Sequence, residues 1–94
     1  MSGRKFKDSI YKQFSLVGRA LASPRRLEVL EVLAQGERSV EALAREVAQP
    51  LANTSHHLQV LREARLVEAR REGHHVYYEL ADAEVFKLIR IVAR

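Results

Sequence analysis

The chain contains no cysteine, no tryptophan, only two prolines and only four glycines among its 94 residues. Without cysteine it has no disulfide, no thiolate ligand for a metal and no thiol nucleophile. No apolar run approaches the roughly 20 residues that span a bilayer, and the basic residues near the N-terminus are not followed by the apolar segment of a signal peptide. We therefore expect a cytoplasmic protein with no membrane segment.

The remaining composition describes one small folded domain. Hydrophobic residues make up 47% and charged residues 30%, which is typical of a globular chain rather than a disordered one. Because 94 residues leave no room for a second core, residues 1–94 are predicted to form a single domain. A core of this size is limited, and a dimer interface would add to its stability.

Charge is distributed unevenly along the chain, whose net charge is +4. Residues 1–26 carry seven basic and one acidic side chain (net +6), residues 27–69 four and seven (net −3), and residues 70–94 five and four (net +1). Basic segments can bind nucleic acid by releasing counterions from phosphates, or they can simply keep a protein soluble. Charge alone leaves both interpretations open.

Amphipathic helices are expected at both ends of the chain. Apolar residues recur at helical spacing over residues 6–22. Ser23 and Pro24 then have the pattern of an N-cap and a first helical residue, and Gly36 is placed to end this second helix. A last helix over about residues 83–93 carries another broad apolar face. The two terminal helices have more apolar surface than one small core needs, which predicts a homodimer interface.

Residues 40–64 have the pattern of a helix-turn-helix. A short helix is followed by a tight connection, and Pro50 opens a longer helix over about residues 51–64. In this longer helix Thr54 lies four residues before Leu58, so both side chains should face the core. The remaining residues at its start are mostly polar or small and should face outward.

Residues 66–80 alternate apolar and polar residues in two short runs, which predicts a β-hairpin. The tip, Arg71-Glu72-Gly73-His74, contains the glycine that a hairpin turn favours. Tyr77 and Tyr78 should point to opposite faces, with Tyr78 toward the core. The predicted order is four helices, two strands and a helix, which is a mostly α, α+β winged helix-turn-helix.

Four sequence runs are specific in combination. They are residues 22–27, residues 33–37, residues 55–64, which begin Ser55-His56-His57-Leu58, and residues 71–80, which begin Arg71-Glu72-Gly73-His74. Over essentially its whole length the chain resembles the ArsR/SmtB family of bacterial transcriptional repressors. Residues 34–61 are most similar to members that carry a C-terminal rhodanese domain, and the chain ends before such a domain could begin.

The resemblance implies a homodimeric repressor that binds an inverted repeat in double-stranded operator DNA and, in many relatives, is released by an inducer such as a metal ion. One family metal site uses a cysteine pair at positions matched here by Ser39 and Glu41. Another uses Asp-x-His on the last helix, matched by Asp82 and Glu84, with a second pair that would follow Arg94. No metal site and no cofactor are therefore expected, and the inducer stays open among a metal, a small molecule and a sulfur species.

The four histidines are not spaced as a metal site either. His56 and His57 are adjacent, so a helix points them about 100° apart. His74 and His75 are neighbours on the hairpin, where successive side chains face opposite ways. Close to phosphate each histidine would gain charge, so DNA affinity should rise as the pH falls.

Two groups of residues are predicted to contact DNA. At the start of the helix over residues 51–64, polar groups can pair with base edges and apolar groups can meet thymine methyls. On the hairpin, cationic groups beside a glycine turn can meet phosphates or the minor groove. The alternative is a solvated surface, with His57 partly buried and Arg71 paired to Glu72 or Glu79. The helix group is Leu51, Ala52, Asn53, Ser55, His56, His57 and Gln59, and the hairpin group is Arg70, Arg71, Gly73 and His74.

Other function classes fit these residues less well. The sequence offers no nucleophile–base arrangement, glycine-rich phosphate loop or paired carboxylates in a plausible cleft, so an enzyme is not expected. Two alternatives stay open: a regulatory module of a longer, sulfurtransferase-linked protein, and a winged helix used for protein contacts. An open reading frame that continues past Arg94 would favour the first, and the lack of a steep salt dependence in duplex binding would favour the second.

Overall fold

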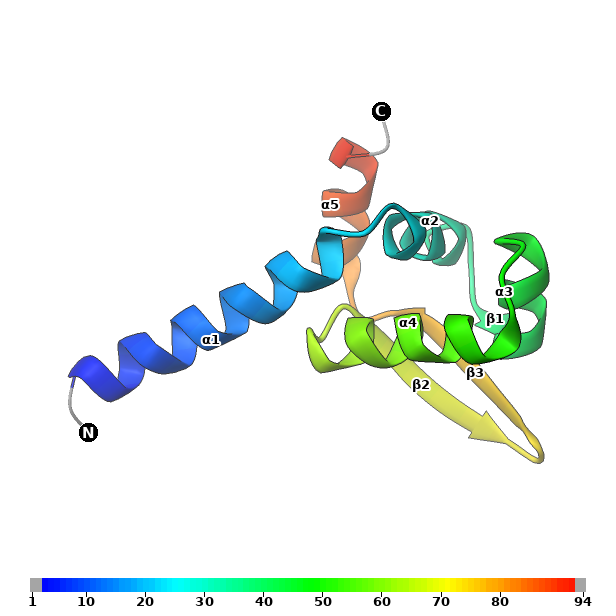
Figure 1. Ribbon diagram of the computed structural model, residues 1–94, viewed down its shortest axis with the longest axis horizontal. Coiled ribbons are helices and arrows are strands. Elements are labelled where there is room, and N and C mark those ends of the chain that lie inside the picture. The colour runs from blue at the N-terminus through cyan, green and yellow to red at the C-terminus, as the bar shows by residue number, and fades with distance from the viewer. Residues whose placement is uncertain (1–2, 93–94) are drawn as a thin grey trace.

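The computed structural model describes residues 3–92 and shows a helical domain with a small β-sheet (Figure 1). The predicted fold class is confirmed, and residue 93, the predicted end of the last helix, lies outside the described residues. The helices are α1 (Gly3–Leu21), α2 (Pro24–Leu33), α3 (Val40–Glu46), α4 (Leu51–Glu63) and α5 (Ala83–Val92), and the strands are β1 (Arg38–Ser39), β2 (Val67–Glu72) and β3 (His75–Leu80).

Serine caps explain where α2 and α3 begin. Ser23 Oγ accepts a hydrogen bond from the amide of Arg26 at 3.3 Å, and Pro24 follows as the first residue of α2. Ser39 Oγ accepts one from the amide of Ala42 at 3.1 Å at the start of α3. Each hydroxyl satisfies an amide that has no partner within its own helix.

A third strand adds to the predicted hairpin. The antiparallel sheet has the order β1-β3-β2, and in it Arg38 and Ser39 pair with Tyr78 and Tyr77. A two-residue strand is too short to show an alternating pattern in the sequence, and it forms because the edge of β3 offers it hydrogen-bonding partners. The loop before β1 contains Gly36, three residues beyond the end of α2, so this glycine does not itself end the helix as predicted.

The hairpin of β2 and β3, called the wing from here on, has a tighter turn than the sequence predicts. Strand β2 extends through Glu72, which pairs with His75, so the loop consists of Gly73 and His74 only. Of these two residues only Gly73 has a positive φ (+61°), the pattern of a type II′ hairpin turn. The predicted four-residue tip is therefore a two-residue loop, because strand pairing continues beyond the last apolar residue of β2.

The apolar core lies between α2, α3, α4 and the sheet. Thr54 is fully buried, and its hydroxyl donates a hydrogen bond to the carbonyl of Pro50 at 3.1 Å. The inward orientation predicted for Thr54 and Leu58 is confirmed. Tyr78 is partly buried and packs against the core, also as predicted. The largest fully buried apolar side chains are Leu30, Leu43, Leu58, Leu61, Val29, Val47 and Val67.

Helix α1 projects from the domain and meets it through its C-terminal half (Figure 1). Leu16, Val17 and Leu21 pack against the core there. Gln13 Nε2 donates a hydrogen bond to the carbonyl of Ala64, the residue after α4, at 3.1 Å. The helix that leaves the domain is thus connected directly to the end of α4.

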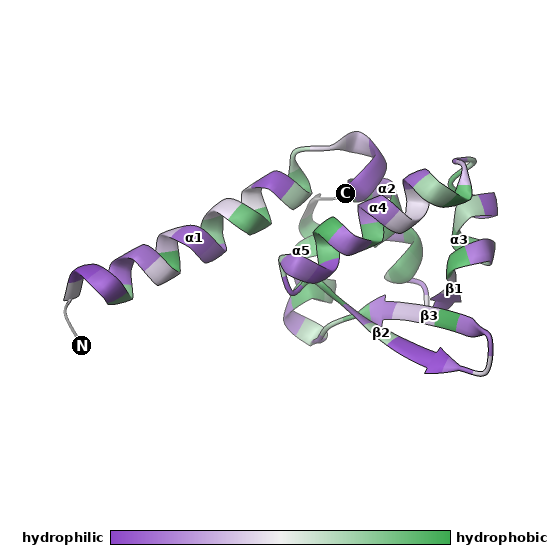
Figure 2. Cartoon of the chain, turned by 60° about the horizontal axis from the view of Figure 1, so that its bottom comes forward, coloured by the Kyte–Doolittle hydropathy of each residue, from purple (hydrophilic) through white to green (hydrophobic). Residues whose placement is uncertain are grey.

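Hydrophobic residues also recur along the projecting part of α1, where the ribbon alternates between green and purple (Figure 2). Phe6, Tyr11 and Phe14 are 54%, 55% and 70% exposed, and on α5 Phe86 and Ile91 are 39% and 71% exposed. The described part of one chain does not cover these side chains. None of the helices within residues 3–92 has the length and apolarity needed to cross a membrane.

Candidate nucleic-acid interface

The outward side of α4 carries most of the residues that the sequence predicts to contact DNA. Thr54 and Leu58 are buried on one side of α4, so the residues on the opposite side of its first turns point away from the core. Leu51 is 52% exposed at the start of the helix although it is a large apolar residue. All members of the predicted helix group except His57 are exposed, namely Leu51, Ala52, Asn53, Ser55, His56 and Gln59.

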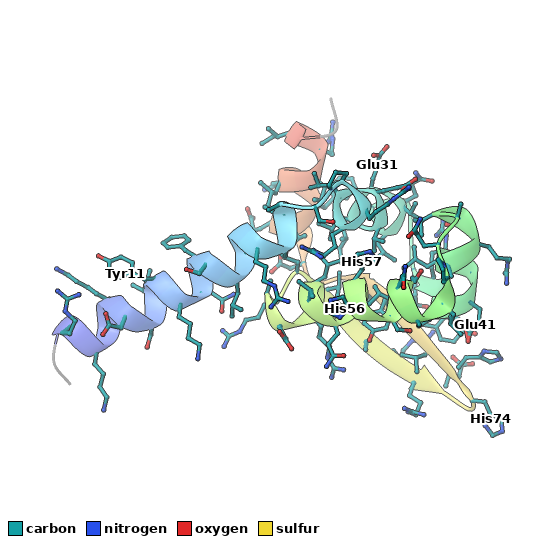
Figure 3. All side chains as sticks on the ribbon, in the orientation of Figure 1. Tyr11, Glu31, Glu41, His56, His57 and His74 are labelled. Carbon is teal, nitrogen blue, oxygen red and sulfur yellow. The ribbon has the colours of Figure 1, made fainter. Side chains whose placement is uncertain are left out.

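His57 is partly buried between α4 and α2 (Figure 3). Its Nδ1 is 3.5 Å from Nη1 of Arg26. Arg26 also donates hydrogen bonds at the end of α1, from Nε to the carbonyl of Ala20 (3.0 Å) and from Nη2 to the carbonyl of Arg19 (2.8 Å). Burial, and then the positive charge of Arg26, lower the pKa of His57 below its ordinary value of 6.5. In the free domain His57 therefore lies beside the guanidinium of Arg26 and is not a charged group exposed to solvent.

The rings of His56 and His57 are not arranged as two ligands of one metal ion. Their ring centroids are 6.2 Å apart, and the ring planes are tilted by 48°. Among the residues that the structure describes, no three histidine, aspartate or glutamate side chains come together as a metal ion would require. His56 thus stands on the exposed side of α4, while His57 belongs to the contact with α2.

An open hollow lies between α4 and the wing. Ser55, Gln59, Arg62 and Glu63 line it from α4, and Tyr78 lines it from β3. Arg62 was not among the residues predicted to contact DNA. Its spacing from Ser55 and Gln59, seven and three residues, places all three on one side of the helix, and this is a signal that the sequence does contain.

Strand alternation separates the two arginines of the wing. The face of β2 that contains the buried Val67 also contains Ala69 and Arg71. The opposite, outer face carries Glu68, Arg70 and Glu72. The sequence predicts that Arg70 and Arg71 act together, but the sheet directs them to opposite sides.

Arg70 is engaged by carboxylates on the outer face. Its Nε and Nη2 donate hydrogen bonds to the two carboxylate oxygens of Glu37 at 3.2 and 2.8 Å, and its Nη1 donates to Glu72. Its guanidinium also lies 4.8 Å from the ring centroid of Tyr77. The hydrogen bond from Arg70 lowers the pKa of Glu37, and the hydrogen bonds to Glu37 and Glu72 raise the pKa of Arg70. Both groups therefore stay ionised across the physiological pH range.

Arg71, Gly73 and His74 are exposed at the outer end of the wing, and Figure 3 shows His74 at its tip. Among the described residues no acid pairs with Arg71, and the ion pair with Glu72 that the sequence offers as its alternative is made by Arg70 instead. The opposite strand, β3, begins at His75, whose Nδ1 is 3.9 Å from Oε1 of Glu41 on α3. Arg71 is therefore the arginine of the wing whose charge is available to a partner.

The arrangement of α3, α4 and the wing defines the class of this domain. Helices α3 and α4 are joined by a short turn, and the exposed start of α4 lies beside a β-hairpin that closes against the same core (Figure 1). This is a winged helix-turn-helix. Residues 23–69 match the family described as bacterial regulatory protein, arsR family, and the chain belongs to this family.

Two individual relatives are a transcriptional regulator and a homolog of a transcriptional repressor. The chain is 47% identical over 90 residues (93% of its length) to the HTH-type transcriptional regulator Rv0324 of Mycobacterium tuberculosis, and 46% identical over 74 residues (79%) to a transcriptional repressor SmtB homolog of Synechocystis. It spans only 40% and 56% of the lengths of these two relatives.

A solved structure is similar over almost the whole chain. It is the solution structure of the homodimeric winged helix-turn-helix DNA-binding domain Mb0332 of Mycobacterium bovis, which superimposes with a TM-score of 0.88 at 45% sequence identity. The match covers 99% of this chain and 84% of that one. The fold of the described residues is thus that of a winged helix-turn-helix domain throughout.

The environment of His57 predicts a pH dependence of stability. Its pKa is lowered in the folded state, so the unfolded chain binds the proton more tightly, and the free energy of unfolding should fall as the pH drops below about 6.5. Urea unfolding between pH 5 and pH 8 should show this loss in the wild type, and His57→Gln should reduce it. The matched control is His74→Gln at the exposed tip, and an equal effect of the two substitutions on the pH dependence would contradict the assignment.

Proposed function

We propose that this chain is the DNA-binding domain of a homodimeric transcriptional repressor, with α4 in the major groove and the wing on the adjacent backbone or minor groove of an inverted-repeat operator. The observation that carries the proposal is the exposed polar start of α4 beside a hollow and an unpaired wing arginine. The relatives support it, since they include a transcriptional repressor SmtB homolog and a homodimeric winged helix-turn-helix DNA-binding domain. Because the chain spans about half the length of the relatives named above, the activity of the whole protein is part of the proposal.

Base recognition is assigned to the first turns of α4. Asn53 and Gln59 can each pair with an adenine edge through two hydrogen bonds, and Ser55 and His56 can donate to or accept from a base. Leu51 and Ala52 are exposed beside them and suit contact with thymine methyl groups. A B-form major groove is about 12 Å wide and accepts one α-helix, so these side chains would reach base edges together.

The hollow between α4 and the wing is proposed to hold one strand of the DNA backbone. With α4 in the major groove and the wing at the adjacent minor groove, the sugar–phosphate strand that separates the two grooves must pass between them. Arg62 lines this hollow and has no ion pair among the described residues, so it is available to a phosphate. Glu63 lines the same hollow and would oppose that contact.

Arg71 and His74 are proposed to contact phosphates or the minor groove from the wing, and Gly73 allows the tight turn that brings them close. His57 would act differently. A phosphate near it would counteract the effect of Arg26, so proton uptake would accompany binding and DNA affinity would rise as the pH falls.

Dimerisation is assigned to the exposed apolar surfaces of α1 and α5. Phe6, Tyr11 and Phe14 on α1, together with Phe86 and Ile91 on α5, are accessible in one chain and would be covered by a second copy.

Phe14→Glu should place a charge in this interface and shift the protein to a monomer in sedimentation velocity. Lys12→Glu, an exposed position on the same helix, is the control. If the Phe14→Glu protein sediments as the wild type does, this face of α1 is not the dimer interface.

Removal of the wing arginine should weaken binding to every duplex. If Arg71 neutralises one phosphate, Arg71→Ala should make the negative slope of log affinity against log salt concentration less steep, by about one unit. Fluorescence anisotropy on a selected and a random duplex between 50 and 300 mM salt measures this. The control is Lys87→Ala on α5, which removes the same charge away from the wing, and an unchanged slope for Arg71→Ala would remove Arg71 from the interface.

Removal of a base-reading amide should act on specific DNA alone. Asn53→Ala should cost about 1–3 kcal/mol on a duplex selected by the wild-type protein from a random pool, and much less on random DNA. Equal losses on both DNAs would take Asn53 out of the specificity set. Selection that enriches no inverted repeat, together with salt-independent binding, would favour a winged helix used for protein contacts.

The alternative of a regulatory module in a sulfurtransferase-linked protein concerns the rest of the gene product. It predicts an open reading frame that continues past Arg94 into a rhodanese domain with a cysteine nucleophile, which the present chain does not contain. That observation would leave the DNA-binding role of this domain intact and would add a candidate source for its signal.

A further inference from the structure

We propose that Glu37 and Arg70, with Tyr77 between them, form a brace that holds the wing in its DNA-binding orientation, and that Arg70 acts on DNA through the position of the wing rather than by touching a phosphate. The proposal rests on the DNA-binding function proposed above. It makes Glu37, an acidic residue outside both groups of predicted contacts, a positioning residue for DNA binding.

The wing brace crosses the full width of the sheet. Arg70 on β2 is paired with Tyr77 on β3, and Tyr77 is paired with Ser39 on β1. Neighbouring strands lie about 4.8 Å apart, so the side chain of Arg70 must extend across β3 to reach the segment before β1. It does so over the ring of Tyr77, at 4.8 Å from the ring centroid, and ends in a two-point contact with Glu37 at 2.8 and 3.2 Å.

Glu37 is itself attached to the helix-turn-helix. The next residue, Arg38, donates from Nη1 to the carbonyls of Gly36 (2.9 Å) and Glu37 (3.2 Å), and from Nε to Glu46 of α3 at 3.0 Å. The loop that carries Glu37 is therefore tied to α3, which packs against α4. Through Arg38, Glu37 and Arg70, the wing is connected to the two helices that would enter and flank the major groove.

Beyond the brace, the outer part of the wing meets the helix-turn-helix through the contact of His75 Nδ1 with Oε1 of Glu41 on α3, at 3.9 Å and between largely exposed side chains. Within residues 3–92, β1 pairs only with Tyr77 and Tyr78, so residues 71–76 form a two-stranded ribbon with no third strand beside it. An isolated ribbon of this kind is marginally stable. Arg71 and His74 lie on this ribbon, directly beyond the brace, so a change in the angle of the wing at Arg70 would displace both of them.

The charge of the cluster argues against a direct phosphate contact by Arg70. All three of its guanidinium nitrogens are engaged by carboxylates. Two carboxylates, Glu37 and Glu72, and one guanidinium add up to a net charge of −1. A phosphate would meet a cluster of its own sign on the outer face, whereas Arg71 on the other face offers an uncompensated charge.

The decisive variant is Glu37→Gln, because the two roles of Arg70 predict opposite results. If Arg70 contacts phosphate, removing the competing carboxylate should strengthen DNA binding. If Arg70 is part of the brace, Glu37→Gln should weaken binding to the selected duplex by about three- to tenfold, a range typical of residues coupled in one network. Glu68→Gln is the matched control, since it removes the same charge from the same outer face without touching the brace, and it should leave the affinity within about twofold of wild type.

Two further variants test the contact geometry. Arg70→Lys keeps the charge but loses the two-point fork, so it should weaken binding about as much as Glu37→Gln does, whereas a phosphate contact would tolerate lysine. The double exchange Glu37→Arg with Arg70→Glu should recover affinity relative to either single change. A direct contact predicts the reverse, because it would place a carboxylate against phosphate.

A measurement without DNA separates the two proposals. In the free protein, amide hydrogen exchange at residues 71–76 should be faster in Glu37→Gln than in Glu68→Gln, with the exchange of core amides of α4 unchanged. The brace proposal is overturned if the Glu37→Gln protein binds the duplex as tightly as wild type or more tightly, and if amide exchange in the wing is unchanged. A wild-type protein that selects no duplex overturns the proposed function instead, and the exchange experiment still decides whether the brace holds the wing.

Discussion

Burial of one side of α4 is the interaction on which the rest of this domain depends. Leu58 and Leu61 are fully buried, and Thr54 can join them because its hydroxyl donates to the carbonyl of Pro50 one turn earlier. A buried hydroxyl without that bond would cost about 1–3 kcal/mol. With these positions held against α2, α3 and the sheet, the rotation of α4 about its axis is determined, and so is the direction in which Asn53 and Gln59 point.

The same helix is held from outside the core by α1. Gln13 donates to the carbonyl of Ala64 after the end of α4, and Arg26 links the last carbonyls of α1 to His57. In the proposed dimer, α1 would be the element that meets the second copy. The relative orientation of the two α4 helices would then be set through these contacts, and His57, whose pKa is lowered by burial and by Arg26, lies at one of them.

The wing distributes its charges according to the pleat of the sheet. Arg70 and Arg71 are neighbours in the chain. Arg70 pairs with carboxylates on the outer face of the sheet, whereas Arg71 lies on the face that is directed toward α4. A strand can thus combine a structural arginine and an available one in consecutive positions. This separation is also why a basic dipeptide in a wing does not by itself present two charges on the same face.

Periodicity was sufficient to predict the helices and the hairpin of this protein, because apolar spacing of 3.6 or 2 residues follows directly from which side of a helix or strand is buried. Thr54 facing inward and Tyr78 packing against the core follow from that rule. The rest depended on contacts between residues far apart in the chain. β1 is too short to have a period, Arg62 borders the hollow only because the wing folds beside α4, and Glu37 meets Arg70 across 33 residues and three strands. The sequence determined which surfaces of each element are polar or apolar. The tertiary structure decided which charges pair with each other and which remain available to a partner, because ion pairing depends on distance in space and not on position along the chain.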